Sequence, residues 1–251
     1  MTDGVTAPGF EAVREAFERN LADGLEIGGA VAVWRDGKSV VDLWGGIRDQ
    51  ADRKPWEKDT LVNVWSAGKG VVALAVAMLV ERGKLDYTAP VARYWPEFAA
   101  NGKQDITLDQ VMSHQAGLDG LPVPLSDSQR MAWTPVIDVL AAMKPNWAPG
   151  SACVYHAETF GYLAGELVRR VDGRSIGQFV AQEIAEPLAV SFFFGLPQPQ
   201  DHRVATISAS EEAYDWVVQG AASAYPFAYR NRNFSATAPN ERAWRAAEMP
   251  A

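Results

Sequence analysis

The longest apolar run of the chain covers residues 71–80. All ten residues of this run are apolar, and residues 81–83, which follow, are Glu, Arg and Gly. A run bounded in this way is typical of a helix that is buried on most sides, and the glycine can end it because glycine adopts positive φ without steric cost. Ten residues are too few to cross a bilayer, which takes roughly 20. The pattern therefore predicts a buried helix that begins near Ser66 and ends near Arg82.

Upstream of this helix, the pattern predicts another helix and a β-hairpin. The apolar positions that share one helical face, between Pro8 and Gly24, are Phe10, Val13, Phe17 and Leu21. Residues 30–34 and 39–44 are two β-rich runs joined through Asp36 and Gly37, and Asp-Gly between such runs favours a hairpin. Residues 49–58 are polar and predict a loop.

After residue 85 the patterns are mostly helical and are interrupted by proline and glycine. The expected helices cover residues 108–113 after the cap Thr107, residues 136–143 after the N-cap Thr134 and Pro135, residues 160–171, and residues 175–185 after the cap Ser175. Residues 192–194, three phenylalanines, are a candidate short strand, and beyond residue 196 the periodicity is weak.

Composition narrows the class of protein. A chain of 251 residues that is 48% hydrophobic can form one large domain or two small ones. The net charge of −8 argues against a nucleic-acid-binding role. The single cysteine, Cys153, excludes an internal disulfide framework. Residues 1–10 lack a basic segment followed by an apolar one, so no signal peptide is visible and a cytoplasmic location is expected.

Ser66 and Lys69 stand at i and i+3 in the predicted first turn of the buried helix, so their side chains share one face. A serine hydroxyl is a poor nucleophile unless a base lies within hydrogen-bond reach. Lysine can be that base where burial or nearby positive charge favours the neutral amine, and a buried helix N-terminus supplies both. The same spacing also fits a serine N-cap followed by a solvated lysine. Gly68 and Gly70 each cost a helix about 1 kcal/mol relative to alanine, which indicates that backbone or a substrate approaches closely.

Other patterns carry less weight. Residues 173–177 fit Gly-x-Ser-x-Gly, but that nucleophile elbow needs a strand before the serine, and here a helix is expected to precede it. Ser175 is therefore interpreted as an N-cap. A phosphate-binding loop would need glycine at position 63 and Ser or Thr at position 70, where the chain has Asn63 and Gly70. No metal site is expected, because the spacing of the three histidines is not that of metal ligands. They are His114, His156 and His202.

Three local patterns occur in a characteristic order. Ser-Ala-Gly-Lys at residues 66–69 opens the buried helix, and Ser-His-Gln-Ala-Gly-Leu follows at residues 113–118. Pro-Gly-Ser-Ala-Cys-Val-Tyr-His-Ala then stands at residues 149–157, before Gly-Tyr-Leu-Ala-Gly at residues 161–165. Together they resemble the serine β-lactamase-like superfamily, in particular its class C-like branch and the family VIII carboxylesterases. The resemblance covers the chain from about residue 10 to residue 200.

The resemblance implies an α/β fold of the β-lactamase/transpeptidase type, in which an antiparallel sheet is flanked by helices. Residues 1–251 would form a single domain with a mostly helical insert at about residues 85–190. Family members also carry a third motif, of the Lys-Thr-Gly, His-x-Gly or Trp-x-Gly kind, on a C-terminal strand, and no match occurs by residue 251. The chain therefore looks like the N-terminal two-thirds of such a protein, with C-terminal strands missing. We expect the 251-residue protein to have an open sheet edge, to express poorly or to hydrolyse p-nitrophenyl butyrate weakly.

The same resemblance assigns the catalytic residues. Ser66 would be the acylated nucleophile, Lys69 its base partner, and Tyr155 would match the tyrosine of the family's Tyr-x-Asn motif. A lysine ammonium beside Tyr155 would stabilise the phenolate, which could take the serine proton and return it to the leaving group; the alternative is a buried tyrosine with a satisfied hydroxyl. His114 would brace a loop rather than take part in the chemistry. Ala157 replaces the asparagine of the motif, and the loss of that amide favours an esterase over a dedicated β-lactamase.

The expected function is hydrolysis of short-chain carboxylic esters through an acyl-Ser66 intermediate, with no cofactor and no metal. The expected partner is a small-molecule ester or lactam substrate, without nucleic acid or membrane, and the oligomeric state stays open. One alternative is a β-lactamase or a D-Ala-type peptidase. An alternative of another class is a degenerate, non-catalytic remnant of the fold.

Overall fold

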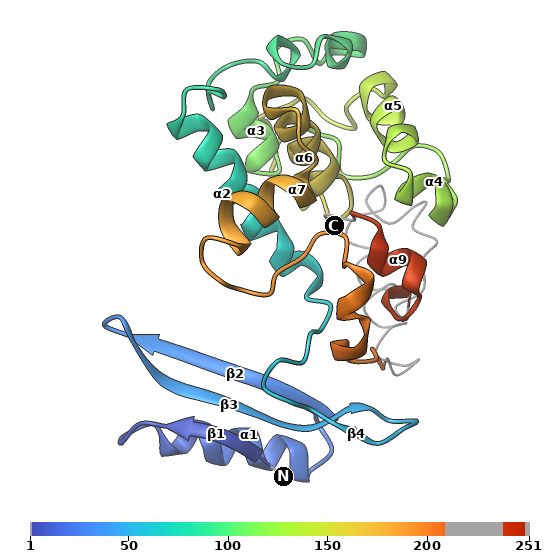
Figure 1. Cartoon of the computed structure of the whole chain (residues 1–251). Coiled ribbons are helices and arrows are strands. Elements are labelled where there is room, and N and C mark those ends of the chain that lie inside the picture. The colour runs from blue at the N-terminus through green and yellow to red at the C-terminus, as the bar shows by residue number, and fades with distance from the viewer. Residues whose placement is uncertain (1, 209–237, 249–251) are drawn as a thin grey trace. The chain divides into compact units, whose positions relative to one another are not determined.

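The computed structural model describes residues 2–208 and 238–248 (Figure 1). The chain divides into two compact units. The first unit contains residues 1–63 and 199–208, and the second contains residues 64–198 and 209–251. All sheet strands belong to the first unit and all α-helices of the described residues except α1 belong to the second.

The first unit is built on an antiparallel sheet with the strand order β1-β3-β2. Its strands are β1 (Thr2–Thr6), β2 (Gly28–Arg35), β3 (Lys38–Asp49) and β4 (Lys54–Pro55), which pairs with the end of β3. The predicted hairpin is confirmed as β2 and β3, and its turn residues Asp36 and Gly37 have φ of 51° and 73°. No described strand pairs with the outer edge of β2.

The predicted N-terminal helix is confirmed as α1 (Glu11–Ala22), which lies against β1 and β3 (Figure 1). The prediction of a plain loop at residues 49–58 is wrong in part, because Lys54 and Pro55 pair with β3. The returning segment after η5 (Gln198–Arg203) is held by a parallel bridge between Leu61 and Val204.

The second unit is helical, and its residues 85–190 contain helices and loops without a sheet strand. Its elements are η1 (Trp65–Ala67), α2 (Gly68–Glu81), η2 (Val91–Arg93), η3 (Pro96–Gly102), α3 (Leu108–Met112), α4 (Asp127–Met131), α5 (Thr134–Ala142), α6 (Thr159–Asp172), α7 (Ile176–Val180), the π-helical turn η4 (Ala181–Ala185), η6 (Ala238–Asn240) and α9 (Arg242–Ala246). Helix α2 packs against α6, and every residue of α6 from position 159 to 168 is buried. These two helices form the centre of the unit's core and fix the place of the residues that precede each of them.

Two local predictions are wrong. Residues 192–194 do not form a strand, because the Phe192 and Phe194 rings pack edge to face and join the helical core instead. The N-cap of α5 is Trp133 rather than Thr134, which is the first helical residue. Trp133 has φ of 64°, and its indole N–H donates to the buried Glu166 carboxylate at 2.9 Å. This hydrogen bond holds Trp133 at the N-cap, so α5 begins one residue earlier than the local N-cap pattern predicts.

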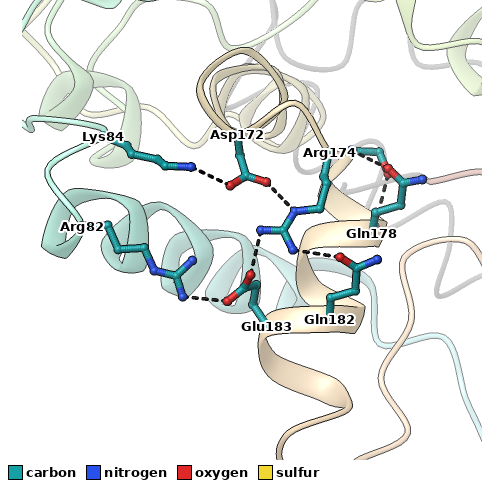
Figure 2. A network of polar contacts seen from close by, with 8 residues as sticks. Arg82, Lys84, Asp172, Arg174, Gln178, Gln182 and Glu183 are labelled. Atoms are coloured by element: carbon teal, nitrogen blue, oxygen red, sulfur yellow. Dashed lines mark hydrogen bonds and ion pairs between the residues drawn. The ribbon is translucent and has the colours of Figure 1, made fainter.

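A network of ion pairs joins the C-terminal ends of α2 and α6 to the α7–η4 segment (Figure 2). Arg174 binds both Asp172 and Glu183, with 2.7 Å between its Nη2 atom and Glu183 Oε1. Lys84 contacts the other oxygen of Asp172 at 3.0 Å, and Arg82 contacts the other oxygen of Glu183 at 2.7 Å. The charges therefore alternate along the network, and each carboxylate bridges two cations.

We expect Arg174→Ala to lower the melting temperature by about 2–4 °C, the shift that ~1 kcal/mol produces in a chain of this size. Arg174 is the only described residue that contacts both carboxylates of the network, and its hydrogen bond is the main reason why the pKa of Asp172 falls to about 2. Thermal unfolding in low and high salt measures the effect, which salt should reduce. Arg93→Ala is the matched control, because Arg93 is exposed and forms no ion pair among the described residues. Equal shifts for both variants would contradict a stabilising role of the network.

Candidate active site

Ser66 lies in η1, a single 3₁₀ turn that leads directly into α2. Gly68 joins the two elements with helical dihedrals (φ −57°, ψ −29°), so the backbone continues into α2 without a break. The predicted helix start near Ser66 is therefore confirmed, with a first turn that is 3₁₀ rather than α. Trp65, directly before Ser66, has φ of 46°, which is uncommon for a residue other than glycine. Its ring packs against Ala238 and Trp244, so long-range packing holds this turn.

Lys69 is in the first turn of α2, with only 6% of its surface exposed. Its Nζ atom donates one hydrogen bond to Ser66 Oγ at 3.0 Å and another to the Ala157 carbonyl at 2.8 Å. The predicted proximity of the serine hydroxyl and the lysine amine is present. The Ala157 carbonyl was not predicted, because a backbone atom leaves no signal in residue identity.

The two glycines near Ser66 have different surroundings. A Cβ atom at Gly68 would lie 3.2 Å from the Phe194 ring, whereas a Cβ atom at Gly70 would meet nothing within 4 Å among the described residues. The close approach expected at Gly68 therefore comes from an aromatic side chain. Nothing in the described part of the chain accounts for Gly70.

Tyr155 lies beside Lys69, although 86 positions separate them in the sequence. The Lys69 Nζ atom is 5.2 Å from the centroid of the Tyr155 ring, within the range of a cation–π contact. Tyr155 is 40% exposed, which argues against the alternative of a buried structural tyrosine. Its hydroxyl forms no hydrogen bond to residues 2–208 or 238–248. The hydrogen bond that we expect from Tyr155 to Ser66 or Lys69 stays a prediction.

His114 and His156 flank Tyr155 and connect two loops. The His114 carbonyl accepts from the Val154 N–H at 3.1 Å, and His114 Nδ1 accepts from the His156 backbone N–H at 3.0 Å. The prediction that His114 braces a loop is confirmed by these two bonds. His156, which is completely buried, was missed as a site-forming residue, and its position directly after Tyr155 was the available signal.

Ser175 caps α7, as predicted. Its Oγ atom accepts from the Gln178 N–H at 3.2 Å and donates to the Glu248 carboxylate at 2.8 Å, and the Gln178 side chain completes a capping box. The preceding element is helix α6, which ends at Gly173 with φ of 88°. This is the geometry of a helix-to-helix corner and not of a nucleophile elbow.

We expect Ser175→Ala to destabilise the protein by about 1 kcal/mol, the usual cost of removing an N-cap, without lowering the hydrolytic rate per folded molecule. Urea unfolding measures the first effect and active-site titration the second. Ser175→Thr is the matched variant, because it keeps a capping oxygen. A loss of turnover in Ser175→Ala as large as that in Ser66→Ala would restore the Gly-x-Ser-x-Gly interpretation.

Among residues 2–208 and 238–248, no group of three or more His, Cys, Asp or Glu side chains could hold a metal ion. Within the same described ranges, no helix has both the length and the apolar character needed to cross a membrane.

Comparison with known proteins places this geometry in a family. The sequence profile of the beta-lactamase family matches residues 13–246. The chain belongs to the beta-lactamase family, and its fold is of the β-lactamase/transpeptidase type, as the resemblance implied.

Its relatives include esterases. The esterase/beta-lactamase LipL of Mycobacterium tuberculosis (strain ATCC 25618 / H37Rv) is 42% identical over 185 residues, which cover 74% of this chain and 43% of LipL. Esterase EstB of Burkholderia gladioli is 29% identical over 191 residues, which cover 69% of this chain and 48% of EstB. The crystal structure of a family VIII carboxylesterase is 41% identical with a TM-score of 0.90, over 100% of this chain and 66% of that one. The chain thus spans less than half of these two curated relatives and about two-thirds of the solved structure.

Proposed function

We propose that the protein is a serine hydrolase that cleaves short-chain carboxylic esters through an acyl-Ser66 intermediate. The observation that carries this proposal is the buried Lys69 side chain, whose Nζ atom donates to Ser66 Oγ at 3.0 Å and to the Ala157 carbonyl at 2.8 Å. The hydrogen bond to the Ala157 carbonyl holds the Lys69 side chain in place beside Ser66. The exposed Ser66 remains open to a substrate.

Because Lys69 donates to Ser66 Oγ, we propose that the serine proton passes to another group when Oγ attacks. Tyr155 is a titratable side chain beside Lys69, whose Nζ atom lies 5.2 Å from the centroid of the phenol ring. In the proposed reaction, the phenolate takes the Ser66 proton while Oγ bonds to the carbonyl carbon of the ester. Tyr155 then protonates the departing alkoxide and the acyl-enzyme forms. In the second half of the reaction, water attacks the acyl carbon while Tyr155 takes a proton from the water. Tyr155 then returns this proton to Ser66 Oγ, which releases the acid and restores Ser66.

Two observations favour esters over lactams. Ala157 has no side-chain amide near the serine, and its backbone carbonyl accepts the Lys69 hydrogen bond instead. The relatives' names include esterase and carboxylesterase, although LipL carries both esterase and beta-lactamase in its name. We therefore propose a small ester as the substrate, with β-lactamase activity as the second candidate. We also propose a cytoplasmic location, which cell fractionation would test.

Mass spectrometry after exposure to a reactive phosphonate ester tests the nucleophile. We expect a single covalent adduct on the tryptic peptide that contains Ser66, and none on Ser66→Ala. Rates on p-nitrophenyl butyrate and on a chromogenic cephalosporin then compare ester and lactam cleavage. An unlabelled wild-type protein would support a non-catalytic remnant of the fold, and a label on Ser175 would refute the assignment. A faster reaction with the cephalosporin would support the β-lactamase alternative.

A further inference from the structure

The loop that carries Tyr155 is joined to residues 113–118 by hydrogen bonds at several points. The Gly150 N–H donates to the Gln115 carbonyl at 2.9 Å, and the Val154 N–H donates to the His114 carbonyl at 3.1 Å. The Cys153 thiol also lies 3.2 Å from the Ser113 carbonyl. Most of these contacts use backbone atoms that any residue could supply. Besides the Cys153 thiol, the rings of His114 and His156 make side-chain hydrogen bonds between the two segments.

The hydrogen bonds of His156 determine its tautomer. Its Nε2 atom accepts from the Leu118 N–H at 3.0 Å, and its Nδ1 atom lies 2.6 Å from the Val154 carbonyl. A carbonyl can only accept, so Nδ1 carries the proton and Nε2 is the bare nitrogen. The ring is completely buried. A second proton on Nε2 would remove the acceptor that the Leu118 N–H needs.

His114 must have the opposite tautomer. Its Nδ1 atom accepts from the His156 backbone N–H at 3.0 Å, so in the neutral ring the proton lies on Nε2. Burial, followed by His156 and Lys69, lowers the pKa of His114 to about 4, and burial lowers the pKa of His156 to about 4. Both rings are therefore neutral near pH 7. The neutral forms are also the only ones in which both nitrogen acceptors are available.

The ring of His114 also packs on Tyr155. The two ring centroids are 5.0 Å apart, and the centroid of the Phe160 ring lies 4.9 Å from that of the imidazole. Tyr155 thus has His114 near its ring and the Lys69 ammonium 5.2 Å from its centroid. The His114 backbone has φ of 61°, a strained value for a histidine. Such strain persists only where the surroundings over-determine the conformation, and here they include the His156 N–H and the Tyr155 ring.

We propose that His114 and His156 are positioning residues for Tyr155: two neutral imidazoles of opposite tautomer that hold the phenol ring beside the Lys69 ammonium. His156 ties the backbone on both sides of Tyr155 to residues 113–118. Its ring bonds to the Val154 carbonyl and to the Leu118 N–H, and its own backbone N–H donates to His114 Nδ1. His114 receives that N–H and packs its ring on the phenol. This inference rests on the proposed function for its catalytic consequence, but the tautomers follow from the hydrogen bonds alone.

His114→Asn tests the role of the imidazole ring. Asparagine tolerates positive φ, and its Oδ1 atom can take the place of Nδ1 as the acceptor for the His156 N–H. The variant should therefore fold with a melting temperature near that of the wild type, while the contact on Tyr155 is lost. We expect the rate of phosphonate labelling at Ser66 and kcat on p-nitrophenyl butyrate to fall about 10- to 100-fold, with little change in KM, because displacements of about 1 Å can have effects of this size. His114→Ala should lose both rate and stability.

Long-range ¹H–¹⁵N spectra of the histidine rings test the tautomers without any activity measurement. We expect a neutral Nδ1–H ring for His156 and a neutral Nε2–H ring for His114 at pH 7. The same tautomer in both rings, or a charged ring, would overturn the inference, as would an unchanged labelling rate in His114→Asn. Absence of labelling at Ser66 in the wild type would instead refute the proposed function, while the spectra would still decide the tautomers.

Discussion

Tyr155→Phe is expected to lower kcat for ester hydrolysis by about 10²- to 10⁴-fold, the usual contribution of a general acid–base group. Phenylalanine keeps the ring, so the contact with His114 at 5.0 Å and the cation–π contact with Lys69 at 5.2 Å should remain. Only the hydroxyl is lost, and it has no hydrogen-bond partner among the described residues. The free energy of unfolding should therefore change by less than about 0.5 kcal/mol, as for other substitutions away from packed or paired groups.

Tyr162→Phe is the matched control. Tyr162 is completely buried, and its hydroxyl donates to the Arg130 carbonyl at 3.0 Å. Removal of this hydroxyl leaves a buried acceptor with one bond fewer, which typically costs about 1–3 kcal/mol, while Ser66 and Lys69 are not touched. Urea unfolding and single-turnover kinetics on both variants separate the two effects. If Tyr155→Phe retains most of its turnover, or loses turnover only as the folded fraction falls, Tyr155 is not the proton-transfer group.

Local periodicity was sufficient to predict the elements whose hydrophobic pattern matches their burial. Helices α1, α2 and α6 and the β2–β3 hairpin were predicted in this way, because each contains its own apolar stripe or turn signal. Strand β1 was missed. Its sequence, Thr-Asp-Gly-Val-Thr, has no apolar run, and it becomes a strand by pairing with β3. A Cβ atom at Gly4 would lie 2.0 Å from the Asp42 carbonyl oxygen, so the requirement for glycine there comes from a strand about 40 residues away.

The site could be predicted from the sequence as residue identities but not as a hydrogen-bond network. The i, i+3 spacing of Ser66 and Lys69 is local, and the structure places their side chains 3.0 Å apart. The Ala157 carbonyl was out of reach of sequence reasoning, which expected only the loss of an amide at this position. In the same way, the opposite tautomers of His114 and His156 depend on which nitrogen faces which backbone group. The catalytic roles of Ser66, Lys69 and Tyr155 stay predictions.

The secondary-structure predictions were wrong where a tertiary contact overrides a local sequence signal. The three phenylalanines at residues 192–194 have high strand propensity, yet Phe194 packs on Gly68 at the start of α2. The Thr134-Pro135 pair is a good N-cap signal, yet the bond from Trp133 to the buried Glu166 places Trp133 at the cap. In both cases an aromatic side chain finds a partner far away in sequence, which no window of local pattern contains.

The second large effect is expected in the pH dependence of stability. The pKa of buried His156 is lowered to about 4, mainly by burial, with the Val154 carbonyl acting in the opposite direction, whereas an unfolded histidine titrates near ~6.5. Between these values the unfolded state binds more protons than the folded state, so stability is complete above pH ~6.5 and falls as the pH drops toward 4. At 1.36 kcal/mol per pKa unit, His156 alone would account for up to about 3 kcal/mol. The half-buried His114 would add a smaller loss in the same direction.

Urea unfolding at pH 7.5 and pH 4.5 measures this loss, and His156→Gln isolates it. Glutamine can accept the Leu118 N–H through Oε1 but does not titrate, so the variant should be less stable at pH 7.5 yet lose less stability on acidification. Exposed His202 provides the control, because His202→Gln should leave the difference between the two pH values as in the wild type. The pKa of Asp172, near 2, keeps this carboxylate of the Arg174 network ionised in the folded protein at pH 4.5, and its unfolded form titrates near ~3.9, so Asp172 contributes little to the difference. A loss in His156→Gln as large as that in the wild type would show that the buried histidine does not cause the acid sensitivity, and that the assigned tautomer does not control the fold around Tyr155.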